Sequence, residues 1–206
     1  MRNLIAKLSF IVLLIATAAS LPAQDTTTQA PAQGATTQTA TQDTTAQAPA
    51  EDKPQITPPS KTFTSQDGHF SIRFAGTPKK ETSEVKLADG ASTTLTQYSV
   101  ELDNSYVTYT IIYNDYPQQY ANGNPQEILG SIRDGVIADK TLISDVPITL
   151  NGVPGRAFAA ADLKKGWFYT IHYYLRGKRL YQLIIVNVTG HPAYLEDEFM
   201  NSFKIW

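Results

Sequence analysis

The side chains of this chain that could carry out chemistry are few and widely spaced. Its three histidines, His69, His172 and His191, form no His-x-His or His-x-x-x-His pair, so they lack the spacing of a metal site. The chain has no cysteine, which excludes a thiolate nucleophile, a disulfide and a Cys-ligated metal. It also lacks the Gly-x-Ser-x-Gly motif of serine hydrolases. We therefore expect no catalytic residue, no bound metal and no cofactor.

The remaining polar candidates have simpler interpretations. The acidic run Glu196–Glu198 falls on an expected helix, where adjacent side chains point about 100° apart and do not converge on one bond. A solvated helix face is the expectation there. His172 shares a strand face with aromatic residues, which favours a hydrogen-bonded, half-buried histidine. A metal site that combines a histidine with Asp103 or Asp115 is the alternative that stays open.

Tyrosine is the residue type whose distribution indicates binding. The spacing places Tyr109 and Tyr113 on one face of an expected strand and Tyr106 on the other. Tyr116 and Tyr120 follow in a loop rich in Pro, Gln, Asn and Gly, where strand propensity does not account for them. Tyrosine is enriched at contact surfaces because it offers a large area and a polar tip. We predict that Tyr116, Tyr120 and Tyr106 bind a partner; the alternative is that they are half-buried tyrosines of a strand and its loop.

The start of the chain predicts export. Residues 8–19 form an apolar stretch of about twelve residues after a positively charged start, shorter than the ~20 needed to cross a bilayer. We therefore expect residues 1–23 to be a signal peptide cleaved after Ala23, with no stable membrane insertion afterwards. Cleavage after Ala18 or Ala19, or an uncleaved anchor, is the alternative.

The composition then changes twice. Residues 24–60 contain 10 Thr, 7 Gln, 7 Ala and 5 Pro, which predicts a disordered linker. Residues 61–206 contain 14 Lys and Arg against 15 Asp and Glu, a net charge of −1, and have the size of one domain. A nearly neutral domain lacks the field that attracts phosphate backbones, so no nucleic acid is expected as a partner. With the signal peptide, this predicts a periplasmic or secreted domain.

Turn signals divide the domain into short strands. Asn151-Gly152 suits a type I′ turn, Gly177-Lys178 a type II′ turn, and Asp89-Gly90 marks a third hairpin. Successive hairpins make the sheet mainly antiparallel. The expected strands are 69–74, 84–87, 92–101, 106–113, 143–150, 153–161, 167–176 and 179–188.

Two segments have helical spacing. Apolar residues recur every four positions over 125–140 and again over 195–203. The strands 167–176 and 179–188 are apolar on both faces, as strands covered on both sides are. We predict an α+β domain with a mainly antiparallel sheet of about seven to eight strands, flanked by helices on both faces in a helix–sheet–helix sandwich.

Several segments together resemble the PsbP-like domains, over nearly all of 61–206. The resemblance implies the same sandwich and a non-enzymatic accessory or assembly role. No photosystem-binding or metal-binding motif of the family matches this chain, so a link to photosynthesis is not carried over. The matching segments are 63–74, 76–79, 150–158, 177–183 and 199–205.

These observations favour an exported, non-enzymatic binding or accessory module that contacts a protein partner in the cell envelope. The alternative is a carrier of a small ligand or lipid, with a cleft between the sheet and helix 125–140. A hydrolase would need a scattered triad, such as His172 beside a Ser or Asp in an open pocket.

Overall fold

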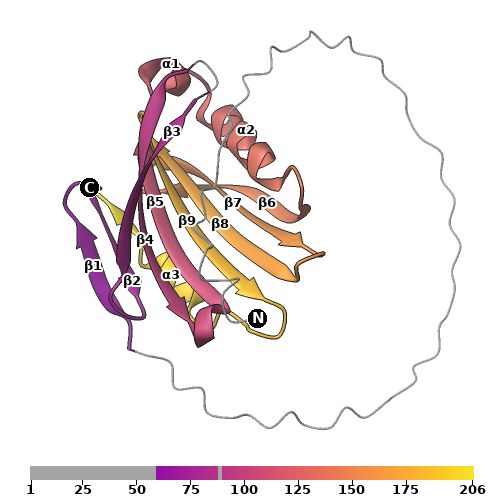
Figure 1. Cartoon of the computed structure of the whole chain (residues 1–206). Helices are drawn as coiled ribbons and strands as arrows, with labels where there is room; N and C mark the ends of the chain where they lie inside the picture. Colours follow the sequence, from indigo (N-terminus) through magenta and orange to yellow (C-terminus); the bar gives the residue numbers. More distant parts are fainter. Residues whose placement is uncertain (1–58, 88–89) are drawn as a thin grey trace, which may run out of the picture. The chain divides into compact units, whose positions relative to one another are not determined.

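The structure, a computed structural model, describes residues 59–87 and 90–206. The predicted signal peptide, nearly all of the predicted linker, and Asp89 of the expected 89–90 turn lie outside these residues. The described residues form two antiparallel sheets and a few helices (Figure 1). The predicted α+β class is therefore confirmed.

The larger sheet has seven strands, all paired antiparallel. The predicted strands 167–176 and 179–188 have the same bounds in the structure. Their turn has Gly177 at φ 57°, as a type II′ turn requires. The turn at 151–152 has Asn151 at φ 50° and Gly152 at φ 83°, as a type I′ turn requires. In spatial order the strands are β3 (Lys79–Lys86), β4 (Ser92–Leu102), β5 (Val107–Asp115), β9 (Arg179–Val188), β8 (Trp167–Arg176), β7 (Val153–Asp162) and β6 (Thr141–Leu150).

The smaller sheet has three strands. The expected strand 69–74 belongs to it as β2 (Phe70–Phe74), between β1 (Lys61–Ser65) and β10 (Lys204–Ile205). Its pairing with β10 joins Ser71 to Lys204, far apart in the sequence. The sequence therefore predicted β2 itself, and the structure adds that it lies in a separate sheet.

One face of the seven-stranded sheet is covered by α2 (Pro125–Ile137), as predicted (Figure 1). The Asn124 side chain caps this helix by accepting a hydrogen bond from the Gln126 N–H at 3.0 Å. The short helix α1 (Gln118–Ala121) precedes it. The α2-side core includes Ile112, Leu129, Ile132, Phe158, Tyr169, Ile171, Tyr173, Leu175, Leu180 and Ile184.

The opposite face is covered by the smaller sheet together with α3 (Glu196–Asn201). This helix is shorter than the spacing over 195–203 predicts, because Phe203 leaves the helix and leads directly into β10. The α3-side core includes Phe70, Ile72, Phe74, Tyr98, Tyr109, Ile111, Tyr113, Tyr181, Leu183, Ile185, Phe199 and Phe203. Both faces of β8 and β9 are covered, which explains why these strands are apolar throughout.

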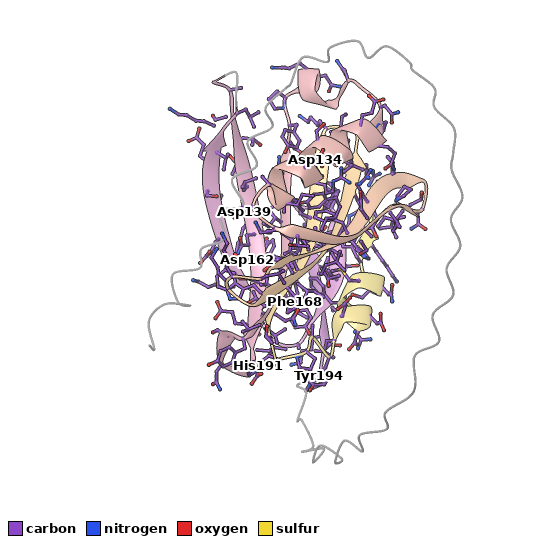
Figure 2. All side chains as sticks on the ribbon, turned by 90° about the vertical axis from the view of Figure 1, so that its right-hand side faces the viewer. Asp134, Asp139, Asp162, Phe168, His191 and Tyr194 are labelled. Carbon is purple, nitrogen blue, oxygen red and sulfur yellow. The ribbon has the colours of Figure 1, made fainter. Side chains whose placement is uncertain are left out.

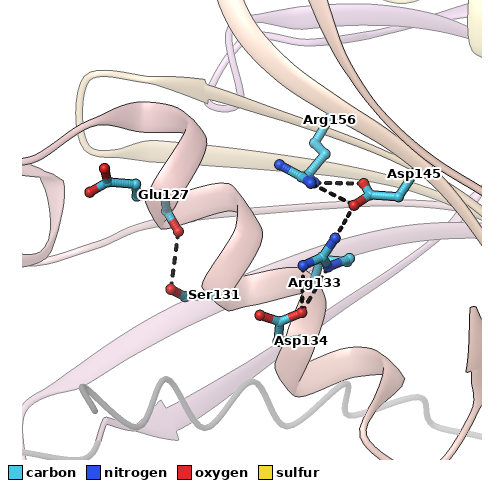
Figure 3. Close-up of polar contacts among 6 residues, drawn as sticks. All are labelled: Glu127, Ser131, Arg133, Asp134, Asp145 and Arg156. Atoms are coloured by element: carbon cyan, nitrogen blue, oxygen red, sulfur yellow. Dashed lines mark hydrogen bonds and ion pairs between the residues drawn. The ribbon is translucent and has the colours of Figure 1, made fainter. Parts of the chain in front are cut away.

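A carboxylate fixes α2 to the sheet (Figure 3). Asp145 of β6 accepts two hydrogen bonds from Arg156 of β7, at 2.6 and 2.5 Å, and also contacts Arg133 of α2. Arg133 in turn pairs with Asp134 at 2.6 Å. Ser131 lies on the solvent side of the helix and donates to the Glu127 carbonyl. Within 59–87 and 90–206, no helix combines the length and the hydropathy required for a bilayer-crossing segment.

Candidate functional site

Three consecutive residues before β5 have an uncommon backbone conformation. Asp103, Asn104 and Ser105 form the short turn η1 (Asp103–Ser105), with φ angles of 50°, 53° and 72°. A side chain in the left-handed region costs about 1–2 kcal/mol, although Asn and Asp tolerate it better than most residues. Such strain persists only where neighbouring contacts impose it, and it concentrates at functional sites. The turn is therefore a candidate functional feature.

The turn and the residue after it, Tyr106, both contact His191. Its Nδ1 contacts Oδ2 of Asp103, and its ring stacks on Tyr106 with the centroids 4.1 Å and the planes 18° apart. The Val188 N–H donates to the Tyr106 carbonyl at 3.0 Å, and the Asn187 side chain donates to the His191 carbonyl at 3.1 Å. The turn and the loop after β9 therefore form one unit that fixes the ring of Tyr106.

Two further exposed aromatic side chains lie at the same end of the domain. Phe168 of β8 is paired with Asn187, whose side chain holds the His191 loop. In the view of Figure 2, Phe168, His191 and Tyr194 all lie in the lower part of the domain, below Asp134 and Asp139. Tyr106 and Phe168 are each 36 % exposed and Tyr194 is 60 % exposed. We call Tyr106, Phe168, His191 and Tyr194 the aromatic end.

Tyr116 is buried, so it is not the exposed side chain that its predicted role in partner binding requires. Its side chain is only 6 % exposed and belongs to the α2-side core. Its backbone N–H donates to the Lys178 carbonyl at 2.8 Å, which ties the loop to the β8–β9 turn. Burial raises the pKa of Tyr116 to about 12, while the Asn114 side chain acts in the opposite direction. The ring packs inward because the chain after β5 folds back over the sheet.

The other two predicted tyrosines have different outcomes. Tyr120 lies in α1, and its side chain is outside the described residues, so its binding role stays a prediction. Tyr106 precedes β5 by one residue rather than lying within the strand, and it is exposed at the aromatic end. The strand faces of Tyr109 and Tyr113 are as predicted, since both lie in the α3-side core.

His172 is half-buried, as expected, but the expected hydrogen bond is missing. Its buried Nδ1 has no hydrogen-bond partner among the described residues. Its cross-strand neighbours are Ala157 and Leu183, which offer no polar side chain. Burial lowers the pKa of His172 below its usual value of 6.5. The nitrogen is therefore not positioned by a Ser or Asp, as a triad would require.

We expect His172 to make the domain less stable in mild acid. The folded state holds this imidazole neutral, so the unfolded chain binds the proton first as pH falls through 6.5. The free energy of unfolding should decrease between about pH 7 and about pH 5, and His172→Gln should lose part of that decrease. Urea unfolding of both proteins at the two pH values measures it. Identical pH dependence in the two proteins would contradict the assignment, because His69 and His191 are common to both.

Asp103 and Asp115, the two aspartates considered as metal ligands beside a histidine, have different partners in the structure. Asp115 pairs with Arg179 at 2.6 Å, and this hydrogen bond lowers the pKa of Asp115. Asp103 contacts His191, but this is a pair of side chains and not the metal site that the sequence left open as an alternative. Across the ranges that the structure covers, no three His, Cys, Asp or Glu side chains gather as a metal site would need. The acidic run 196–198, expected on a solvated helix face, is partly covered at Glu196. Burial raises the pKa of Glu196, and the Thr170 side chain contacts it.

Sequence reasoning missed most of the aromatic end. The sequence pattern places Phe168 on a strand face without indicating binding, and no pattern points to Tyr194. The available signal was Asp103-Asn104-Ser105, since Asp and Asn are the side chains that best tolerate a left-handed backbone. Which loop this turn contacts depends on residues 88 positions away, at His191, and no local pattern reports that.

Comparison with known proteins gives no family match and no match among the curated proteins. Among solved structures, the chain is similar to a cyanobacterial PsbP (CyanoP) from Synechocystis, with 8 % identity and a TM-score of 0.46 over 77 % of this chain and 99 % of that one. It is also similar to a protein from Bacteroides thetaiotaomicron, with 11 % identity and a TM-score of 0.35 over 73 % of this chain and 49 % of that one. A PsbP is thus among the solved structures found. Neither similarity assigns an activity or a partner to this chain.

Proposed function

We propose that this chain is an exported, non-enzymatic binding module that contacts a protein partner in the cell envelope through the aromatic end. The observation that carries the proposal is the stacking of the exposed ring of Tyr106 on His191, directly after the strained turn 103–105. A ring held in place loses little entropy on binding, so its contact area contributes more fully to affinity. Export is the part of the proposal that rests on residues 1–23.

A protein is the partner class that this surface fits. Aromatic residues are enriched at the centres of protein interfaces, where they dominate the binding energy. The ion pairs nearby are local, such as Asp162 with Lys165 at 2.9 Å, and the domain has almost no net charge. A nucleic acid or an anionic membrane would need a basic surface instead. The sequence has no Gly-x-Ser-x-Gly motif, no cysteine and no paired histidines, and this is the reason for proposing a non-enzymatic role.

We expect the variant Tyr106→Ala plus Phe168→Ala to reduce partner capture about tenfold or more, since two anchor side chains are removed. The measurement is chemical crosslinking of the full chain in native envelopes, followed by mass spectrometry. Ile143→Ala is the matched control, because Ile143 is also a large exposed apolar residue but lies on the edge strand β6. Its capture should equal that of the wild type.

A second arm locates the contact directly. A photo-crosslinking amino acid at position 168 should capture the partner, whereas one at position 131, on the solvent side of α2, should not. Equal capture from both positions, or full capture by the double variant, would remove the aromatic end as the contact surface.

A further inference from the structure

Two buried oxygens on the α2 side of the main sheet lack hydrogen-bond partners among the described residues. They are Oη of Tyr173 on β8 and Oε1 of Gln182 on β9. The two residues lie directly opposite each other in the β8–β9 register. Tyr173 is 0 % exposed and Gln182 is 2 % exposed, so bulk water does not reach them. Each buried polar atom without a hydrogen bond costs about 1–3 kcal/mol of stability. Two such atoms side by side are rare in folded domains.

A third buried oxygen comes from the covering helix. Gln126 of α2 donates its Nε2 to the Gly155 carbonyl at 3.1 Å, and its Oε1 is buried without a partner in the described part of the chain. Gly155 pairs with Tyr174 in the β7–β8 register, and its neighbour Arg156 pairs with Tyr173. The helix therefore places another acceptor over the same part of the sheet.

The charges nearby are already paired. Arg156 is the cross-strand neighbour of Tyr173 on β7, and both Arg156 and Arg133 contact the carboxylate of Asp145. An ion bound here would have to compete with Asp145 for its counter-charge, so an uncharged guest is favoured. Burial raises the pKa of Tyr173, which keeps its phenol protonated as a donor. The two glutamine oxygens are acceptors.

We propose that an uncharged hydroxyl-bearing molecule, either water or a small organic guest, binds beneath α2 and bridges Tyr173 Oη to Gln182 Oε1. A hydroxyl group fits because it accepts from the phenol and donates to the amide oxygen at the same time. A buried water with such partners is a common structural element of proteins. The site faces α2, on the opposite side of the sheet from α3, and does not depend on the proposed partner binding.

The test is a double-mutant cycle in the full chain with Tyr173→Phe and Gln182→Met, followed by urea unfolding. A bridging guest predicts that each single change raises the unfolding equilibrium constant about tenfold. The double variant should then raise it by clearly less than the product, because both changes remove the same bridge. Tyr181→Phe sets the scale, since that hydroxyl donates to the Gly68 carbonyl at 2.9 Å.

Two further measurements distinguish the sources of the hydroxyl group. An additional mass in native mass spectrometry that Tyr173→Phe loses identifies an organic guest. No additional mass, with an ordered water between the two oxygens in a high-resolution crystal structure, identifies water. Either result supports the site. An unfolding constant that Tyr173→Phe leaves unchanged or lowers, or a crystal structure in which Tyr173 Oη bonds directly to a protein group, would overturn it.

Discussion

Replacing Asp145 with asparagine is expected to lower the free energy of unfolding by about 3 kcal/mol. The side chain of Asp145 is only 12 % exposed and faces two guanidinium groups, those of Arg133 and Arg156. Asparagine keeps the volume but removes the charge, so the two largely buried cations would repel each other, with only the exposed Asp134 left to pair with Arg133. Because Arg133 belongs to α2 and Arg156 to β7, the loss should loosen the helix from the sheet.

Urea unfolding of Asp145→Asn against the wild type measures this effect. The matched control is Asp139→Asn, since Asp139 also pairs with a cation, Lys140, but its side chain is 70 % exposed. Because water screens the exposed carboxylate of Asp139, its pair contributes about 0–1 kcal/mol, so the control should change little. Equal losses in the two variants would show that the Asp145 cluster does not anchor α2.

Replacing Phe70 with alanine is expected to cost about 4 kcal/mol, the larger of the two effects. Phe70 on β2 is fully buried and its ring contacts five others around it. Removing it would open a cavity between the smaller sheet and the seven-stranded sheet. We therefore expect the smaller sheet to lose its protection against amide hydrogen exchange before the rest of the domain. The five rings in contact are those of Phe63, Tyr98, Tyr113, Tyr181 and Phe203.

Thermal or urea unfolding together with hydrogen exchange checks this prediction. Phe168→Ala is the matched control, because Phe168 is a phenylalanine on an exposed part of β8 and should cost about 1 kcal/mol or less. That result would also show that Phe168 variants keep their fold in the partner-capture experiment. A comparable loss of stability in both variants would contradict the central role given to Phe70.

The hairpins of the main sheet were predictable because their information is local. Asn151-Gly152 and Gly177 adopt positive φ angles that their side chains allow, and two residues are enough to fix the register of the strands on each side. The covering of β8 and β9 on both sides followed from the apolar residues on both of their faces. The helix α2 followed from its four-residue spacing. In each case the pattern extends over fewer than twenty residues.

The parts that could not be predicted depend on contacts between distant segments. Tyr116 looked exposed because its loop is polar, yet the fold turns it into the α2-side core. The contact of Asp103 with His191 joins residues 88 positions apart. Neither β10 as a partner of β2 nor the resulting second sheet has a local signature. The candidate site is therefore mostly a product of tertiary structure, with Tyr106 as the member that the sequence indicated.

The position of β2 between β1 and β10 has a consequence for the order of folding. During synthesis the residues of β2 emerge early, but their register partner Lys204 emerges only after the whole seven-stranded sheet. Until then the apolar side of β2 stays uncovered and one of its edges stays open to wrong pairing. Contacts of such long range also slow folding. The nascent chain therefore needs protection from aggregation for longer than its modest size suggests.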